Sequence, residues 1–324
     1  MKKLLSVLLS VLLLMSLTAC GGSGSSNDDD DVFKVGVVQF VQHEALDAAT
    51  QGFVDALEQE LGKDKVKVDV ENASADPSGC TTIVNGFLSS GVDLIMANAT
   101  PALIAATLAT SEVPILGTSV TDYASALELD NFDGTTGRNV SGTSDLAPLD
   151  GQAAIIKELF PDASTVGIVF CSAESNSAYQ VAVITEELVK LGFEVKEFSF
   201  TDTNDISSVT QAACEGSDVI FIPTDNTAAA NKEAIANVVL PAGKPVVAGE
   251  EGIAKGCAVA TLSISYYDLG FATGLQAAKI LKGEADVSTM PIEYATQFTK
   301  KFNEQICTEL GVTVSEEYEP LSLD

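Results

Sequence analysis

Polar and acidic side chains gather in short segments that follow apolar runs, and their types suit the binding of a small charged molecule. These segments are 39–43, 98–101, 119–122, 172–177, 224–227 and 249–252. Free N–H groups at the start of a helix, with nearby hydroxyls and amides, can hold an anionic group. Carboxylates in the same segments can hold a cationic group. The chemistry indicated is noncovalent recognition.

Catalytic and metal-binding patterns are missing from the sequence. The chain has one His, at position 43, and contains no G-x-S-x-G, G-x-x-x-x-G-K-[ST] or H-E-x-x-H pattern. A Ser-His hydrolase, a phosphate-loop enzyme and a zinc hydrolase are therefore not indicated. The sequence predicts no enzyme, no cofactor and no metal site.

Strands and helices alternate along the chain. Apolar runs predict strands at 34–40, 65–70, 93–97, 113–117, 165–170, 194–200, 218–222 and 245–248. Helical periodicity predicts helices at 45–61, 80–89, from Thr100-Pro101, and at 150–159, 177–191, 207–214 and 227–238. The alternation restarts after Pro148. Two runs of this kind predict an α/β fold with two doubly wound parallel-sheet lobes.

The polar segments fall where ligands bind in such folds. In open parallel sheets, ligands occupy the crevice beyond the carboxyl ends of the strands. Two lobes that face each other with these ends would form a cleft.

The charge of the chain limits its partners. It has 17 Lys and Arg against 46 Asp and Glu, a formal net charge of −29. Nucleic acid and anionic lipid head groups repel such a chain, so no nucleic-acid partner is expected.

The first residues have the features of an export signal. Lys2 and Lys3 precede an apolar run to Leu17, which is too short to span a bilayer. Leu17-Thr18-Ala19-Cys20 resembles a bacterial lipoprotein signal. This resemblance implies a signal peptide at 1–19, a lipid on Cys20 and a flexible tether at 20–32. The protein would face the outside of the cytoplasmic membrane, anchored to it by the lipid alone.

Five further cysteines permit disulfides in that compartment. They are Cys80, Cys171, Cys214, Cys257 and Cys307. Their number is odd and their pairing is left open.

Several stretches together resemble a known family. They are VVQFVQHEALD at 37–47, ANATPA at 97–102, TSVTD at 118–122, NVSGTSDL at 139–146, SAESNS at 172–177, IPTDNT at 222–227 and ISYYDLGFATG at 264–274. In order and spacing they resemble the substrate-binding lipoproteins of ABC importers, of the tryptophan- or tyrosine-binding type. The resemblance implies a class I periplasmic-binding-protein fold that closes about a hinge. It assigns 33–147 plus 266–287 to an N-terminal lobe and 148–265 plus 288–324 to a C-terminal lobe.

The resemblance also implies a function. The protein would capture a small solute, an aromatic amino acid by this likeness, and deliver it to a membrane permease powered by an ATPase. A ligand-sensing module for a receptor is an alternative, as is import of a branched-chain amino acid, a peptide fragment, a nucleoside or a sugar. The sequence departs from relatives at Glu44, at Tyr123 and at Cys171, so the ligand stays open.

An amino acid in the cleft would need groups for both of its charges. Arg138, the only Arg, lies in an exposed type of loop, so helix starts and hydroxyls are expected to hold the carboxylate. The residues expected there are Ser175, Asn176, Ser177, Thr100 and Ser144. Ser175 or Asn176 could instead be an ordinary helix cap.

For the ammonium group the first candidate is Asp225, flanked by Thr224 and Asn226, although it too could be a cap. Glu250 or Glu251 is second, and Asp122 and Asp145 are further alternatives. Aromatic walls are expected from Phe40, Tyr123 and Tyr267. His43 is expected to border the cleft. The absence of Trp makes a sugar a less favoured ligand.

Overall fold

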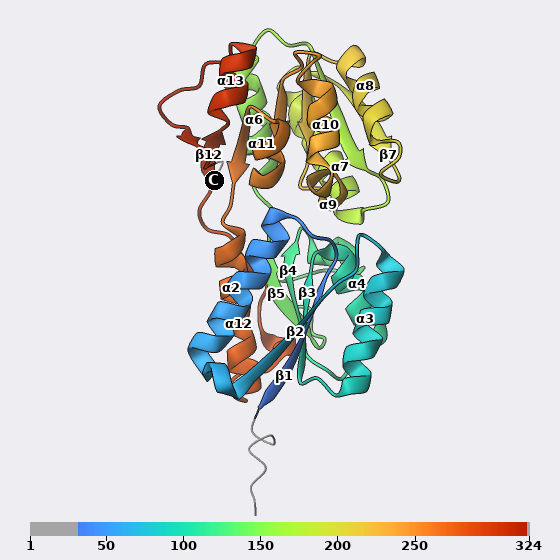
Figure 1. Cartoon of the computed structure of the whole chain (residues 1–324), viewed down its shortest axis with the longest axis vertical. Coiled ribbons are helices and arrows are strands. Elements are labelled where there is room, and N and C mark those ends of the chain that lie inside the picture. The colour runs from blue at the N-terminus through green and yellow to red at the C-terminus, as the bar shows by residue number, and fades with distance from the viewer. Residues whose placement is uncertain (1–31, 323–324) are drawn as a thin grey trace, which may run out of the picture. The chain divides into compact units, whose positions relative to one another are not determined.

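A computed structural model describes residues 32–322 of the chain (Figure 1). The predicted signal peptide, the lipidated Cys20 and the tether up to Asp31 lie outside the described residues. In the described part, no helix is both long and apolar enough to cross a membrane.

The first lobe is built on a six-stranded sheet in which every pair is parallel. Its order is β11-β5-β4-β3-β1-β2. The strands are β1 (Phe33–Gln39), β2 (Val66–Asn72), β3 (Leu94–Asn98), β4 (Ile115–Val120), β5 (Val140–Ser144) and β11 (Glu293–Tyr294). The helices are α2 (Glu44–Leu61), α3 (Pro77–Ser90), α4 (Thr100–Ala109), α5 (Tyr123–Ala126) and α12 (Tyr266–Leu281), with short 3-10 turns η2 (Lys63–Lys65) and η3 (Val287–Thr289).

The second lobe is built on a seven-stranded sheet in the order β13-β12-β10-β9-β8-β6-β7. The strands are β6 (Thr165–Cys171), β7 (Glu194–Phe200), β8 (Val219–Ile222), β9 (Val246–Ala248), β10 (Ala260–Ser263), β12 (Thr299–Phe302) and β13 (Glu319–Pro320). The pairing of β12 with β10 is antiparallel. The helices are α6 (Leu149–Leu159), α7 (Ser175–Lys190), α8 (Ile206–Gly216), α9 (Asn226–Ala230), α10 (Lys232–Val239), α11 (Glu251–Cys257) and α13 (Glu304–Leu310).

The two sheets repeat one topology. The order β2-β1-β3-β4-β5 in the first lobe matches β7-β6-β8-β9-β10 in the second. The strand order reverses beside β1 in one lobe and beside β6 in the other, and ligands of open α/β sheets bind at such switch points. The predicted fold class, two parallel-sheet α/β lobes, is confirmed.

The chain crosses between the lobes after β5, after β10 and after β11. The last crossing corrects the predicted lobe boundary at position 287. Strand β11 pairs in parallel with β5, and Ile292 is buried in the core of the first lobe. The return segment therefore extends to Tyr294, because an edge strand and its apolar anchor hold it on the first sheet.

Helix α12 brings the return segment back onto the first lobe by packing along α2 (Figure 1). Small residues let the two backbones touch. A Cβ atom on Gly270 would lie 1.9 Å from the carbonyl oxygen of Ala49, and one on Gly52 would lie 2.1 Å from that of Tyr267. No side chain fits at either position, so the two glycines fix how closely the helices pack.

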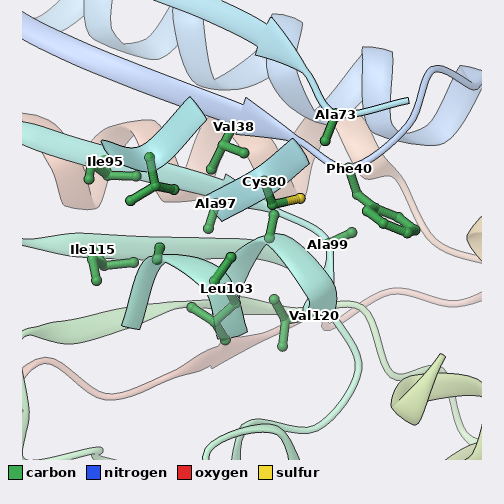
Figure 2. Packing of buried hydrophobic residues seen from close by; sticks show 14 of the residues in the cluster. Val38, Phe40, Ala73, Cys80, Ile95, Ala97, Ala99, Leu103, Ile115 and Val120 are labelled. Carbon is green, nitrogen blue, oxygen red and sulfur yellow. The ribbon is translucent and has the colours of Figure 1, made fainter. Parts of the chain in front are cut away.

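The apolar core of the first lobe reaches the carboxyl ends of its strands. Figure 2 shows Val38, Ile95 and Ile115 along the sheet, with Phe40 and Ala99 at the end of the cluster. All five cysteines of the described chain are buried and free, so the structure contains no disulfide between described residues.

Candidate ligand-binding site

The two switch points meet across the lobes. His43 precedes α2 in extended conformation, and its Nε2 lies 3.3 Å from Oδ1 of Asn226, the first residue of α9. Helices α4 and α5 also contact α7, and α2 contacts α11. The lobes are therefore closed on each other at the carboxyl ends of their strands.

Four buried polar atoms near this meeting point have no protein partner. They are Nδ1 of His43, Oγ1 of Thr100, Oγ of Ser119 and Oδ1 of Asn176. These four follow β1, β3 and β6 or lie near the end of β4. Oδ1 of Asn98 is a further orphan atom at the end of β3, but the amide nitrogen of that side chain donates to Leu46 and Thr50 of α2. The remaining orphan atoms lie elsewhere in the lobes. A buried polar group without a hydrogen-bond partner destabilises the folded protein by about 1–3 kcal/mol. A set of such groups therefore indicates a place where a ligand can supply the missing hydrogen bonds.

Backbone strain accompanies two of these positions. Ala99, just before Thr100, has φ 92°, and Ser119 has φ 54°. The pairing of β4 with β5 shifts register between Gly117 and Val120, around the same serine. Non-glycine residues in such conformations cost about 1–3 kcal/mol and cluster at ligand sites. Sequence reasoning missed Ser119 as a site residue, because residue types alone do not reveal a positive φ.

Glu174 connects the second-lobe segments that meet the first lobe at this junction. Its buried carboxylate accepts hydrogen bonds from Nδ2 of Asn226 at 2.6 Å, and from N and Oγ1 of Thr227 at 2.8 and 2.7 Å. It also accepts one from Nδ2 of Asn176 at 3.2 Å. Glu174 thus joins the start of α7 to the start of α9. It lies within the predicted segment 172–177 but was not singled out there.

Asp225, the first candidate for binding an ammonium group, has a structural role in the second lobe. Its carboxylate is 1% exposed and accepts hydrogen bonds from Ala228 N at 2.8 Å, Cys171 N at 2.6 Å and Ser177 Oγ at 2.8 Å. Burial, together with the nearby Glu174 carboxylate, raises the pKa of Asp225 to about 7. With both oxygens engaged, the side chain caps α9 and ties it to the end of β6.

Four predicted site residues of the second lobe separate into two kinds: Ser175, Asn176, Ser177 and Thr224. Ser177 donates to Asp225, and Thr224 donates its hydroxyl to the carbonyl of Gly249 at 3.3 Å. Ser175 is exposed in the first turn of α7. Among these four side chains, only Asn176 combines burial with an unpartnered oxygen, as Thr100 does in the first lobe. The oxygen of Asn176 is therefore free to accept a hydrogen bond from a ligand.

Three other predicted residues are engaged within their own lobes. Asp122 caps α5 through Ser125 N at 2.7 Å. Ser144 donates to the carbonyl of Thr121 at 2.9 Å. Glu250 caps α11 through two backbone N–H groups, and burial raises the pKa of its carboxyl to about 7. These side chains hold the loops around the cleft in place, and backbone N–H groups occupy both oxygens of Glu250.

The two tyrosines expected as aromatic walls differ in exposure and in hydrogen-bond partner. Tyr267 is exposed and donates to Asp55 at 2.9 Å, whereas Tyr123 is buried and donates to the carbonyl of Thr143 at 3.1 Å. The preceding residue, Tyr266, is buried and donates to Oδ2 of Asp145 at 3.0 Å. Asp145 follows β5 and Tyr266 follows β10, so this hydrogen bond joins two of the segments that cross between the lobes.

Phe40 supplies an apolar surface at the meeting of the lobes. It is 3% exposed and belongs to the core cluster of the first lobe (Figure 2). Ala230, at the end of α9 in the second lobe, packs against that cluster. Phe40 therefore lies where an apolar side chain of a ligand could be enclosed.

A cavity of about 720 Å³ lies beside the chain crossings, and its lining includes Glu44, the residue after His43. Of the predicted site residues Glu250, Glu251 and Tyr267 line it, while Asn176, Thr100 and His43 do not. The candidate ligand site is therefore the closed junction of the lobes, where the orphan atoms are, and not this larger opening.

The fold and the junction define a two-lobed binding protein. Residues 34–320 match the model of the family described as ABC transporter substrate binding protein. The chain belongs to this family. It is accordingly a substrate-binding protein and not an enzyme.

Individual relatives agree with this membership. The chain is 33% identical over 302 residues to a tyrosine-binding protein of Clostridioides difficile (strain R20291), covering 90% of this chain and 87% of the relative.

Two solved structures are also similar. One is an ABC domain in complex with L-Trp from Streptococcus pneumonia, with TM-score 0.84 and 32% identity, covering 88% of this chain and 96% of that one. The other is the ligand-free, open structure of a substrate binding protein with adhesive properties from Clostridium difficile. It has TM-score 0.68 and 36% identity, covering 90% of this chain and 100% of that one.

Proposed function

We propose that this protein captures an aromatic amino acid, tyrosine or tryptophan, between its lobes and hands it to the permease of an ABC importer. The observation that carries the proposal is the set of orphan polar atoms from both lobes at the closed junction. Two relatives, one named for tyrosine and one solved with L-Trp, support the ligand class.

The proposed ligand contacts follow from the free groups. The orphan oxygen of Asn176 accepts from the ligand ammonium, and the hydroxyls of Thr100 and Ser119 donate to its carboxylate. His43 closes over the ligand from the first lobe. Phe40 contacts the aromatic side chain, since aromatic pairs add roughly 0.5–1.5 kcal/mol beyond burial.

The proposal includes where the protein works. Cys20, after the short apolar run, would carry a lipid and anchor the chain at the outer face of the cytoplasmic membrane. A tether of Gly, Ser, Asn and Asp would let the lobes reach the permease. Labelling of the intact protein with a fatty-acid probe, lost in Cys20→Ala, tests this part.

A ligand screen tests the binding proposal. The chain from residue 33 onward is heated with each amino acid, with adenosine and with glucose. L-Tyr or L-Trp should raise the melting temperature by several degrees, because a ligand that binds only the folded state stabilises it. A shift with adenosine or glucose alone would refute the ligand class and leave the family unaffected.

A further inference from the structure

The lobes are joined by a charged cluster that the ligand contacts do not use. Glu44, in the first turn of α2, pairs with Lys232 at the start of α10 and, at 3.1 Å, with Lys255 of α11. Helix α2 belongs to the first lobe, and α10 and α11 belong to the second. Among the ion pairs between described residues, only these two connect the lobes.

The lysines are partly shielded while the carboxylate is accessible. The side chains of Lys232 and Lys255 are 16% and 23% exposed, and that of Glu44 is 50% exposed. Partial burial opposes ionisation of Glu44, yet hydrogen bonds from the two lysines hold its pKa below the ordinary value. The carboxylate is therefore charged at neutral pH, and both lysines face it.

Separation of the lobes would break this cluster. The lysines lie on helices of one lobe and their shared carboxylate on a helix of the other, so both pairs form only when the lobes meet. Glu251 would then remain beside Lys255 at 3.8 Å, and it also pairs with Lys301 at 2.8 Å. Lys232 would lose its described ion-pair partner.

We propose that Glu44, Lys232 and Lys255 form an electrostatic latch that favours the closed form and slows the release of ligand. The latch adds no contact to the ligand. It shifts the balance between open and closed lobes, and it can do so because its interactions differ between those two states. Salt weakens the latch, because the Debye length falls to about 3 Å at 1 M ionic strength and partly exposed charges are then screened from each other.

Small-angle scattering of the ligand-free chain tests the latch. At low salt, Glu44→Gln and Glu44→Lys should have larger radii of gyration than the wild type, with the lysine variant the larger of the two. Adding about 1 M NaCl should expand the wild type and leave Glu44→Gln almost unchanged. The control is Glu60→Gln, which removes an ion pair with Lys282 from the same helix but within one lobe. The control should scatter as the wild type does.

Dissociation of L-Trp, followed by stopped flow, gives a second measurement that rests on the proposed function. Glu44→Gln should release the ligand roughly two- to fivefold faster, as expected for loss of partly exposed ion pairs. Replacing both lysines by Met should have the same effect, and adding Glu44→Gln to that variant should change nothing more.

The outcomes separate the two proposals. If scattering of both Glu44 variants equals that of Glu60→Gln at every salt concentration, the latch is wrong. Failure of every amino acid to bind would refute the ligand class alone, because the scattering measurement needs no ligand.

Discussion

Nε2 of His43 and Oδ1 of Asn226 lie 3.3 Å apart and join the switch point of one lobe to that of the other. His43 is half-buried, and burial of its imidazole lowers the pKa of the ring. Asn226 is held in turn by Glu174 through its Nδ2. A neutral imidazole and a fixed amide thus form a contact that exists only in the closed form.

Loss of this contact should weaken ligand binding. We expect His43→Ala and Asn226→Ala each to reduce the affinity for L-Trp by about tenfold, as expected for a buried hydrogen bond and its neighbours. Calorimetry of the two single variants and the double variant measures the coupling between the residues. Strictly additive losses would mean that the residues act independently of each other.

Thr100→Val should reduce the affinity for ligand without reducing the stability of the fold. The hydroxyl of Thr100 is buried without a protein partner, so removing it should leave the melting temperature unchanged or slightly raised. If a ligand uses this hydroxyl, affinity should fall about five- to tenfold. Thr210→Val serves as a control, because that buried hydroxyl already donates to the carbonyl of Ile206 at 2.7 Å. A loss of stability in Thr100→Val without loss of affinity would remove Thr100 from the site.

Asp225→Ala should show the structural role of this carboxylate. Three donors in the second lobe would lose their acceptor, at about 1–3 kcal/mol for each buried group left unsatisfied. Urea unfolding should show a large destabilisation. Intact stability combined with lost binding would instead support the predicted ammonium-binding role of Asp225.

Stability should rise on mild acidification from pH 8. The pKa values of Asp225 and Glu250 are raised to about 7 and that of Asp145 to about 6, in each case chiefly by burial. A folded-state pKa above the unfolded value means that the folded form binds more protons between the two values. Stability from these groups therefore increases as pH falls from about 7 toward 4. His43, whose pKa is lowered by burial, acts in the opposite direction below about pH 6.5.

Melting temperatures between pH 5 and 8 measure this dependence. The curve should be less steep in Glu250→Gln, which cannot titrate. Asp286→Asn is the matched control, since hydrogen bonds from Ser288 lower the pKa of that exposed carboxyl and its titration lies below the tested range. A melting temperature that increases steadily with pH would contradict the assigned directions.

The sequence predicted the two lobes because alternating apolar runs are a strong local signal. Even so, the helix predicted at 227–238 is two helices, α9 and α10, separated at Asn231. The third crossing was missed because β11 is only two residues long, too short for any periodicity.

The positions of the polar segments were predicted, but the hydrogen bonds of their side chains were not. The polar segments do lie at the carboxyl ends of the strands. The sequence does not show which side chains are left without a partner, because a helix cap such as Asp225 and an unpartnered side chain such as Asn176 occupy equivalent positions after a strand. The side-chain direction of Tyr266 relative to Tyr267 depends on the exact start of α12, which residue types do not fix.

Calorimetric titration of the purified chain with L-Tyr and L-Trp tests the central claim most directly. We expect one of them to bind at a single site in the micromolar range or tighter, and Asn176→Ala to weaken that binding by at least tenfold. Absence of heat from either amino acid, or equal binding by Asn176→Ala, would contradict the proposed aromatic amino-acid site at the junction of the lobes.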